Sequence, residues 1–229
     1  MRFANRFHAG KALAEHLLHF ENDLNALVLG LPRGGVPVAF EVAERLNLPL
    51  DVFLVRKIGV PFRRELAMGA VSIGNIQLFN HELIDQLSIG ARDIEEATAR
   101  ETEELNRQDE LFRHGRRAPT IKGKTVILVD DGLATGSTMA VAIKALRLQN
   151  PLRIVAAVPV GAAASCRSLA ADADEVICAV HPEHFIAVGT WYEDFSPTSD
   201  EEVIRLLDRS HDELAFAVAA VTPRPITKF

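Results

Sequence analysis

The chain of 229 residues lacks several features that define whole classes of protein. It has only two cysteines, which excludes a scaffold built on disulfides. Its longest apolar run, residues 215–221, is far shorter than the roughly 18 residues that a membrane-spanning helix needs. The first ten residues contain no apolar stretch suited to a signal peptide. We therefore expect a cytoplasmic protein with no membrane partner.

A surplus of positive charge is also missing. Acidic residues number 31 against 25 basic ones, a formal net charge of −6, so no nucleic-acid partner is expected. Aromatic residues make up only 6 %, whereas apolar residues reach 48 %, enough for one sizeable core. Cys166 and Cys178 lie in apolar surroundings and are interpreted as small buried side chains in a reducing compartment.

Short apolar runs alternate with helical stretches along most of the chain. The runs predict strands over residues 26–31, 51–55, 125–129, 153–158 and 175–180, and the helical stretches cover residues 36–46, 137–150 and 162–171. Strands that are apolar throughout and separated by helices favour a mainly parallel sheet with helices on both faces, an α/β fold. No repeat or change of composition divides the sequence, so a single domain over residues 1–229 is expected.

Two features interrupt this alternation as an insertion over residues 75–120. The Gly74-Asn75 pair predicts the turn of a hairpin within residues 70–80. Residues 91–114 predict one long charged helix, either solvated on the body or contacting a second copy in a homodimer through its thin apolar stripe. Ser199 and Glu202 form a capping box that opens the last helical region. Residues 222–229 are expected to be loose.

The strongest chemical signal is the segment VILVDDGLATGST, residues 126–138. An apolar strand leads into Asp130 and Asp131, whose carboxylates can accept hydrogen bonds from a vicinal diol or hold hydrated Mg²⁺. The small-residue loop that follows opens a helix, and its backbone N–H groups can surround a phosphate. No lysine precedes Ser137 or Thr138 as a Walker loop requires. A phosphorylated sugar satisfies both halves of the segment.

This segment resembles the motif with which type I phosphoribosyltransferases bind 5-phosphoribosyl-1-pyrophosphate (PRPP). The resemblance implies that Asp130 and Asp131 hold the ribose hydroxyls together with Mg²⁺, directly or through water. It implies that the 5′-phosphate lies in the loop formed by Ala134, Thr135, Gly136, Ser137 and Thr138. One departure is Gly132, where many members of the family have an aliphatic residue.

The resemblance also assigns roles to the sequence LPRGG at residues 31–35 and to Arg56-Lys57. In the first, Arg33 and the amides of Gly34 and Gly35 are expected to bind pyrophosphate. Arg56 or Lys57 is expected to add a second pyrophosphate contact. The residues assigned to catalysis are Arg33, Lys57, Asp130 and Asp131.

Residues 59–65 would match the mobile loop that covers the active site in this family. Arg63 and Arg64 would then close over the departing pyrophosphate, although both also suit a solvated surface.

On the acceptor side, residues 181–195 are expected to form a wall beside the base. Trp191 or Tyr192 could stack on a planar ring, and plugging the edge of the sheet is the alternative. Ala134 stands where hypoxanthine–guanine members carry an acid near the purine N7, which argues against a 6-oxopurine handled in that way. His181 and His184 stand three apart, but the sequence shows no third metal ligand at usable spacing.

The function implied is Mg²⁺-dependent transfer of phosphoribose from PRPP to a nitrogenous base, with release of pyrophosphate, as in nucleotide salvage. A PRPP-binding regulator without turnover is one alternative. Another is a hydrolase of phosphorylated sugars, which needs a base for water such as His81 or Glu65. The basic residues around the leaving group favour the transferase, because a protein that only binds PRPP needs fewer of them.

Overall fold

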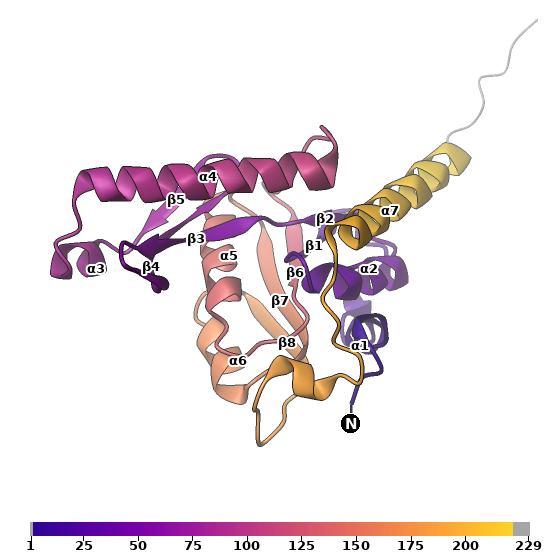
Figure 1. Ribbon diagram of the computed structural model, residues 1–229. Coiled ribbons are helices and arrows are strands. Elements are labelled where there is room, and N and C mark those ends of the chain that lie inside the picture. Colours follow the sequence, from indigo (N-terminus) through magenta and orange to yellow (C-terminus); the bar gives the residue numbers. More distant parts are fainter. Residues whose placement is uncertain (1, 222–229) are drawn as a thin grey trace, which may run out of the picture.

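The computed structural model describes residues 2–221. Met1, residues 222–229 expected to be loose, and the side chains of Arg64 and residues 213–221 lie outside that description. A five-stranded sheet with the order β2-β1-β6-β7-β8 forms its centre (Figure 1). Its strands are β1 (Ala26–Gly30), β2 (Leu50–Val52), β6 (Thr125–Val129), β7 (Arg153–Val160) and β8 (Glu175–Val180). Every neighbouring pair is parallel, so the carboxyl ends of all five strands meet at one edge.

Helices cover both faces of this sheet (Figure 1). The flanking helices are α1 (Arg6–Ala14), α2 (Gly35–Leu46) and α7 (Asp200–Val221) on one face, and α5 (Ser137–Arg147) and α6 (Ala163–Leu169) on the other. Successive residues of β6 point to opposite faces of the sheet. Ile127 therefore packs in the apolar core beneath α1, α2 and α7, and Leu128 in the core beneath α5 and α6. The Ser199 hydroxyl accepts the N–H of Glu202 at the start of α7, as the capping box predicts. The α/β fold predicted from the sequence is confirmed.

A second, antiparallel sheet contains β3 (Val55–Val60), β4 (Arg63–Ser72) and β5 (Ile76–Phe79), in that order. Its β4–β5 pair is the hairpin that Gly74-Asn75 predicts. The strand predicted over residues 51–55 is wrong in extent, because the chain leaves the parallel sheet after Val52 and enters the antiparallel sheet at Val55. Residues 50–54 are all buried, so hydrophobicity alone does not mark the change of sheet.

After the short helix α3 (His81–Gln86), the long helix α4 (Ala91–Arg113) packs on β3, β4 and α7. Arg113 at its end is buried, and its Nε lies 3.1 Å from Oδ1 of Asp51. The same guanidinium donates to the carbonyl of Val52 at 2.9 Å, which fixes the end of α4 to strand β2. Within residues 2–221, no helix combines the length and the apolar character that crossing a membrane requires.

Candidate functional site

An acid pair follows β6 at the carboxyl edge of the parallel sheet. The backbone N–H of Asp131 donates to Oδ1 of Asp130 at 2.9 Å, so the carboxylate of Asp130 is held against the backbone of Asp131. Burial raises the pKa of Asp130 well above its ordinary value, and the neighbouring charge of Asp131 raises it further. Burial also raises the pKa of Asp131, against the opposing effect of Arg6. A bound cation or a pair of hydroxyl donors would stabilise both carboxylates.

Arg6 in α1 is the cation that faces this pair. Its Nε lies 2.8 Å from Oδ2 of Asp131, and its Nη1 donates to the carbonyl of Ser196 at 2.7 Å. The guanidinium also lies 4.0 Å from the centre of the Phe195 ring. Sequence reasoning missed Arg6, because its partner is 125 residues away and no local pattern connects the two. Arg6 therefore fixes the orientation of Asp131.

The loop after β1 lies directly on the acid pair. A Cβ atom added to Gly34 would lie 2.1 Å from Oδ2 of Asp131, and one added to Gly35 would lie 2.9 Å from the Cα of Asp130. Only glycine permits this approach at either position. The peptide bond between Pro32 and Arg33 is cis, and the exposed Arg33 side chain has its Nη1 3.6 Å from Oδ1 of Asp200. The structure thus brings the LPRGG segment beside Asp130 and Asp131.

The small-residue loop connects the acid pair to α5. Gly136, with a φ of +73°, is the residue before the helix, in a conformation that disfavours other residues. The hydroxyl oxygens of Thr135 and Ser137 lie 3.3 Å apart. Lys57 of β3 reaches the loop, and its Nζ donates to Oγ of Ser137 at 2.6 Å. An ammonium group, two hydroxyls and the N-terminus of α5 together form an environment suited to a phosphate.

Arg56, the neighbour of Lys57, is held differently. Its Nε donates to Oε2 of Glu101 in α4 at 2.8 Å, so part of its charge is compensated within the protein. Of the two basic residues, only Lys57 has a described contact with the loop after the acid pair.

The segment after β8 packs against the backbone of the acid pair and of Gly132, which follows it. Val188, at the start of a short 3₁₀ helix (Val188–Trp191), fills the space beside Gly132, where an added Cβ would lie 2.4 Å from Cγ1 of Val188. This contact leaves no room for a side chain at position 132.

Tyr192 comes next, and its hydroxyl donates to the carbonyl of Asp131 at 2.5 Å. The Tyr192 side chain is 4 % exposed, and the rings of Phe3 and Phe195 pack against it at 5.6 and 4.9 Å between centroids. Its ring is therefore covered by protein. Trp191 packs at the border of the same apolar cluster, and within the described part of the chain its Nε1 is buried without a hydrogen-bond partner.

Residues 59–65 form the tip of the β3–β4 hairpin, where Val60 pairs with Arg63. The Arg63 side chain is exposed, Phe62 beside it is fully exposed, and the side chain of Arg64 lies outside the described residues. The role of this tip as a mobile cover remains a prediction.

The acid pair has oxygen atoms suited to Mg²⁺. Arg6 occupies Oδ2 of Asp131 and a backbone amide occupies Oδ1 of Asp130. Among residues 2–221, Oδ2 of Asp130 has no hydrogen-bond donor or ion-pair partner. Mg²⁺ in proteins is held by one or two carboxylates and completes its shell with water and substrate phosphates. The donor set fits that ion.

The fold and the site define an α/β protein that carries an acid pair and, after it, a small-residue loop suited to a phosphate, at one edge of its sheet. The model of the phosphoribosyl transferase domain family matches residues 74–194, which contain both. Two provisionally named phosphoribosyl transferases of Mycobacterium tuberculosis, MT0597 of strain CDC 1551 / Oshkosh and Rv0571c of strain H37Rv, are each 42 % identical over 217 residues, 95 % of this chain. The chain belongs to the phosphoribosyl transferase family.

A solved structure shares the fold over nearly its full length. TT1426 from Thermus thermophilus is 43 % identical, with a TM-score of 0.79, and the match covers 90 % of this chain and 98 % of that chain. By contrast, this chain spans only 49 % of the length of the two mycobacterial relatives. The segments that carry Arg33 and Lys57 precede residues 74–194, the range that the family model matches. The matches to the mycobacterial relatives and to TT1426 are longer than this range, at 95 % and 90 % of this chain.

Proposed function

We propose that this chain transfers the 5-phosphoribosyl group of PRPP to a nitrogenous base and releases pyrophosphate. The observation that carries the proposal is the convergence of three distant segments at one sheet edge. Gly34 lies against Asp131, and Lys57 donates to Ser137 of the loop that follows the acid pair. PRPP carries a phosphate, a vicinal diol and a diphosphate, and each of these groups has matching partners here.

In this proposal the acid pair accepts hydrogen bonds from the ribose 2′- and 3′-hydroxyls, and residues 134–138 surround the 5′-phosphate. Arg33, the amides of Gly34 and Gly35, and Lys57 bind the diphosphate. Mg²⁺, when bound, supplies positive charge to the departing pyrophosphate. The chain itself contributes position and electrostatics, because displacement at C1 by a nitrogen requires no covalent intermediate. Arg63 and Arg64 at the hairpin tip would cover the leaving group.

Ala134 limits which bases can serve as the acceptor. Its methyl group cannot take a proton from a purine, and its carbonyl already accepts the Ser165 hydroxyl at 2.5 Å. A base that needs a carboxylate inside this loop is therefore disfavoured. Trp191 is the better of the two aromatic candidates for a contact with the base, because the ring of Tyr192 is covered by Phe3 and Phe195.

The test is pyrophosphate release from PRPP by the purified chain, with and without Mg²⁺, across purines, pyrimidines and other nitrogen acceptors. We expect Mg²⁺-dependent release with one acceptor, and loss of that release in Asp130→Asn/Asp131→Asn. Arg92→Ala, at a side chain 90 % exposed on α4, is the matched control and should retain full activity.

Other outcomes decide between the alternatives. Release without any acceptor would indicate a hydrolase. PRPP binding without release across the panel would indicate a regulator, and absence of PRPP binding would contradict the site itself.

A further inference from the structure

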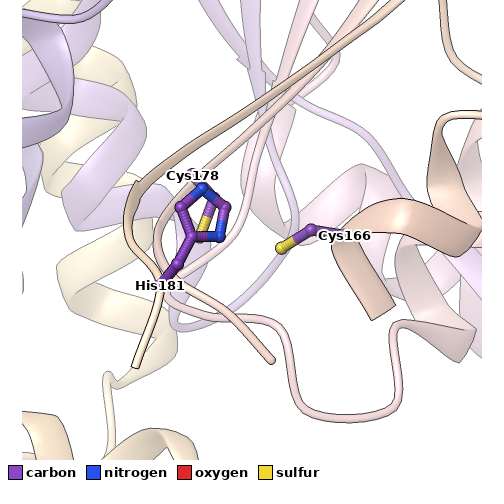
Figure 2. A group of neighbouring side chains, drawn as sticks. All are labelled: Cys166, Cys178 and His181. Carbon is purple, nitrogen blue, oxygen red and sulfur yellow. The ribbon is translucent and has the colours of Figure 1, made fainter. Parts of the chain in front are cut away.

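Two cysteines and a histidine lie close together next to Gly161, which packs against Leu133 of the loop that follows the acid pair. Cys166 projects from α6 toward Cys178 of β8 and toward His181, which follows β8 directly (Figure 2). The two sulfur atoms and an imidazole nitrogen all lie within 4.8 Å of one another. From the sequence, His181 had only His184 as a nearby candidate ligand. The fold instead supplies two thiols from separate elements.

Glycine at position 161 makes this approach of the thiols possible. A Cβ atom added to Gly161 would lie 2.8 Å from Sγ of Cys166 and 3.2 Å from Sγ of Cys178. The same atom would lie 3.1 Å from Cβ of Leu133, so the glycine cannot move away from the sulfurs to admit a side chain. Any larger residue at this position would separate the two thiols.

The cluster is buried on one side and open on the other. Cys166 and Cys178 are 6 % and 9 % exposed and belong to the apolar core between the sheet and α5 and α6. His181 is exposed, so an ion can reach the thiols past the imidazole. The ligand group contains no carboxylate, which makes it unlike the acid pair and poorly suited to Mg²⁺.

We propose that Cys166, Cys178 and His181 bind a soft divalent cation of the Zn²⁺ type, independently of the PRPP site. Two thiolates and one imidazole are a known zinc ligand set, and solvent would fill the fourth position. Tetrahedral zinc holds such ligand atoms about 3.5–3.8 Å apart, by its bond lengths, so side-chain movements of about 1 Å suffice. Binding releases the two thiol protons to solvent, and the two thiolates balance the charge of the ion.

Such an ion would join α6 to β8 next to the loop after the acid pair. Ser165, which precedes Cys166, donates to the carbonyl of Ala134 at 2.5 Å. The backbone N–H of Ala162 donates to the carbonyl of Leu133 at 2.9 Å. The bound ion would therefore stabilise the segment on which that loop rests, and we expect a higher midpoint of thermal unfolding.

Cobalt(II) titration of the full chain, reduced and treated with a chelator, tests the proposal. We expect one equivalent of Co²⁺ to produce a thiolate-to-cobalt charge-transfer band in the near ultraviolet and the visible bands of tetrahedral cobalt. One equivalent of Zn²⁺ should remove both, because a site of this type prefers Zn²⁺ to Co²⁺. Bound Zn²⁺ should also protect both thiols from a thiol reagent.

Matched variants identify the ligands. His181→Ala should weaken Co²⁺ binding at least about tenfold, whereas His184→Ala, in the same exposed segment but outside the cluster, should leave it unchanged. Cys166→Ser should reduce the charge-transfer band by about half, since one of two thiolates is lost. His181 is exposed, so its variant tests the proposal even where a cysteine variant does not fold.

Three results would overturn the proposal. The first is a reduced protein that shows no charge-transfer band with Co²⁺. The second is equal Co²⁺ affinity in His181→Ala and the parent chain, which would mean adventitious binding elsewhere. The third is a disulfide between Cys166 and Cys178 in protein purified without reductant, together with a failure to bind Zn²⁺ once that disulfide has been reduced.

Discussion

Arg6 and Asp131 form an ion pair with 2.8 Å between Nε and Oδ2, and this contact joins the first helix to the acid pair. The ion pair gives Asp131 a different electrostatic environment from that of the adjacent Asp130. Burial is the strongest influence on the pKa of both side chains and raises it; at Asp131 the charge of Arg6 opposes this increase, whereas at Asp130 the charge of Asp131 adds to it. The pKa values of both carboxyls are therefore raised, and Arg6 directly opposes the increase at Asp131.

Asp130→Asn should stabilise the ligand-free protein at neutral pH. A raised pKa in the folded state means that the native protein holds this proton more tightly than the unfolded chain does. Native stability therefore falls as the pH rises from the ordinary pKa of an aspartate through the raised one. The variant removes that penalty, and the free energy of unfolding should rise by on the order of 1 kcal/mol. Thermal unfolding across pH should show the gain at neutral pH and its loss in acid, where Asp130 is protonated.

Asp131→Asn serves as the matched control for this prediction. Its gain should be smaller than that of Asp130→Asn, because the substitution also removes the ion pair with Arg6. An equal or larger gain for Asp131→Asn would contradict the unequal roles assigned to the two carboxylates.

Lys57→Ala should weaken PRPP binding by about tenfold to a hundredfold, the usual range for a lost hydrogen bond to a charged group. The reason is the contact of its Nζ with Ser137, which places the ammonium where a phosphate would lie. Calorimetric titration of both variants measures the effect against Lys144→Ala, at an exposed lysine on α5. Equal affinity in Lys57→Ala and Lys144→Ala would remove Lys57 from the site.

Arg33→Ala should weaken pyrophosphate binding much more than binding of ribose 5-phosphate. Arg33 follows β1 on the loop that covers the acid pair, and its exposed guanidinium is assigned to the leaving group only. Competition of each ligand with PRPP gives the two affinities. Equal losses for both ligands would place Arg33 elsewhere.

Gly34→Ala should destabilise the protein by about 1–3 kcal/mol, the usual effect of overpacking, and should weaken PRPP binding. The φ of Gly34 is −62°, so the effect is purely steric and comes from the approach of the new Cβ to Asp131. Chemical denaturation and PRPP titration measure both effects. Gly90→Ala is the control, because its Cβ would meet only Asp93, at an ordinary 3.4 Å. Unchanged stability and affinity in Gly34→Ala would contradict the described packing of the loop.

The acid pair and the loop after it could be predicted because they are contiguous. A strand, two acids, small residues and a helix follow one another within residues 125–147, so local patterns suffice. The bounds of β6 and β8 agree with the predicted residues 125–129 and 175–180 for the same reason. Each is a continuous apolar run with polar or turn residues at its ends.

What the sequence did not indicate depends on contacts between distant segments. Arg6 reaches Asp131 only because α1 packs at the edge where β6 ends, and no pattern near Arg6 predicts that. Likewise, the sequence leaves open whether Tyr192 stacks on a base or plugs the edge of the sheet, and only the fold shows its hydroxyl donating to the carbonyl of Asp131 with Phe3 packed against its ring. The change of sheet between β2 and β3 could not be predicted from hydrophobicity, because the connecting residues Phe53 and Leu54 are buried like the strand before them.

PRPP binding to the parent chain and to Asp130→Asn/Asp131→Asn, measured by calorimetry with and without Mg²⁺, is the most decisive test of the site. We expect binding to the parent chain that strengthens with Mg²⁺. We expect no measurable binding to the double variant, with the fold retained by circular dichroism. Full-strength binding of PRPP by the folded double variant would contradict the assignment of the site.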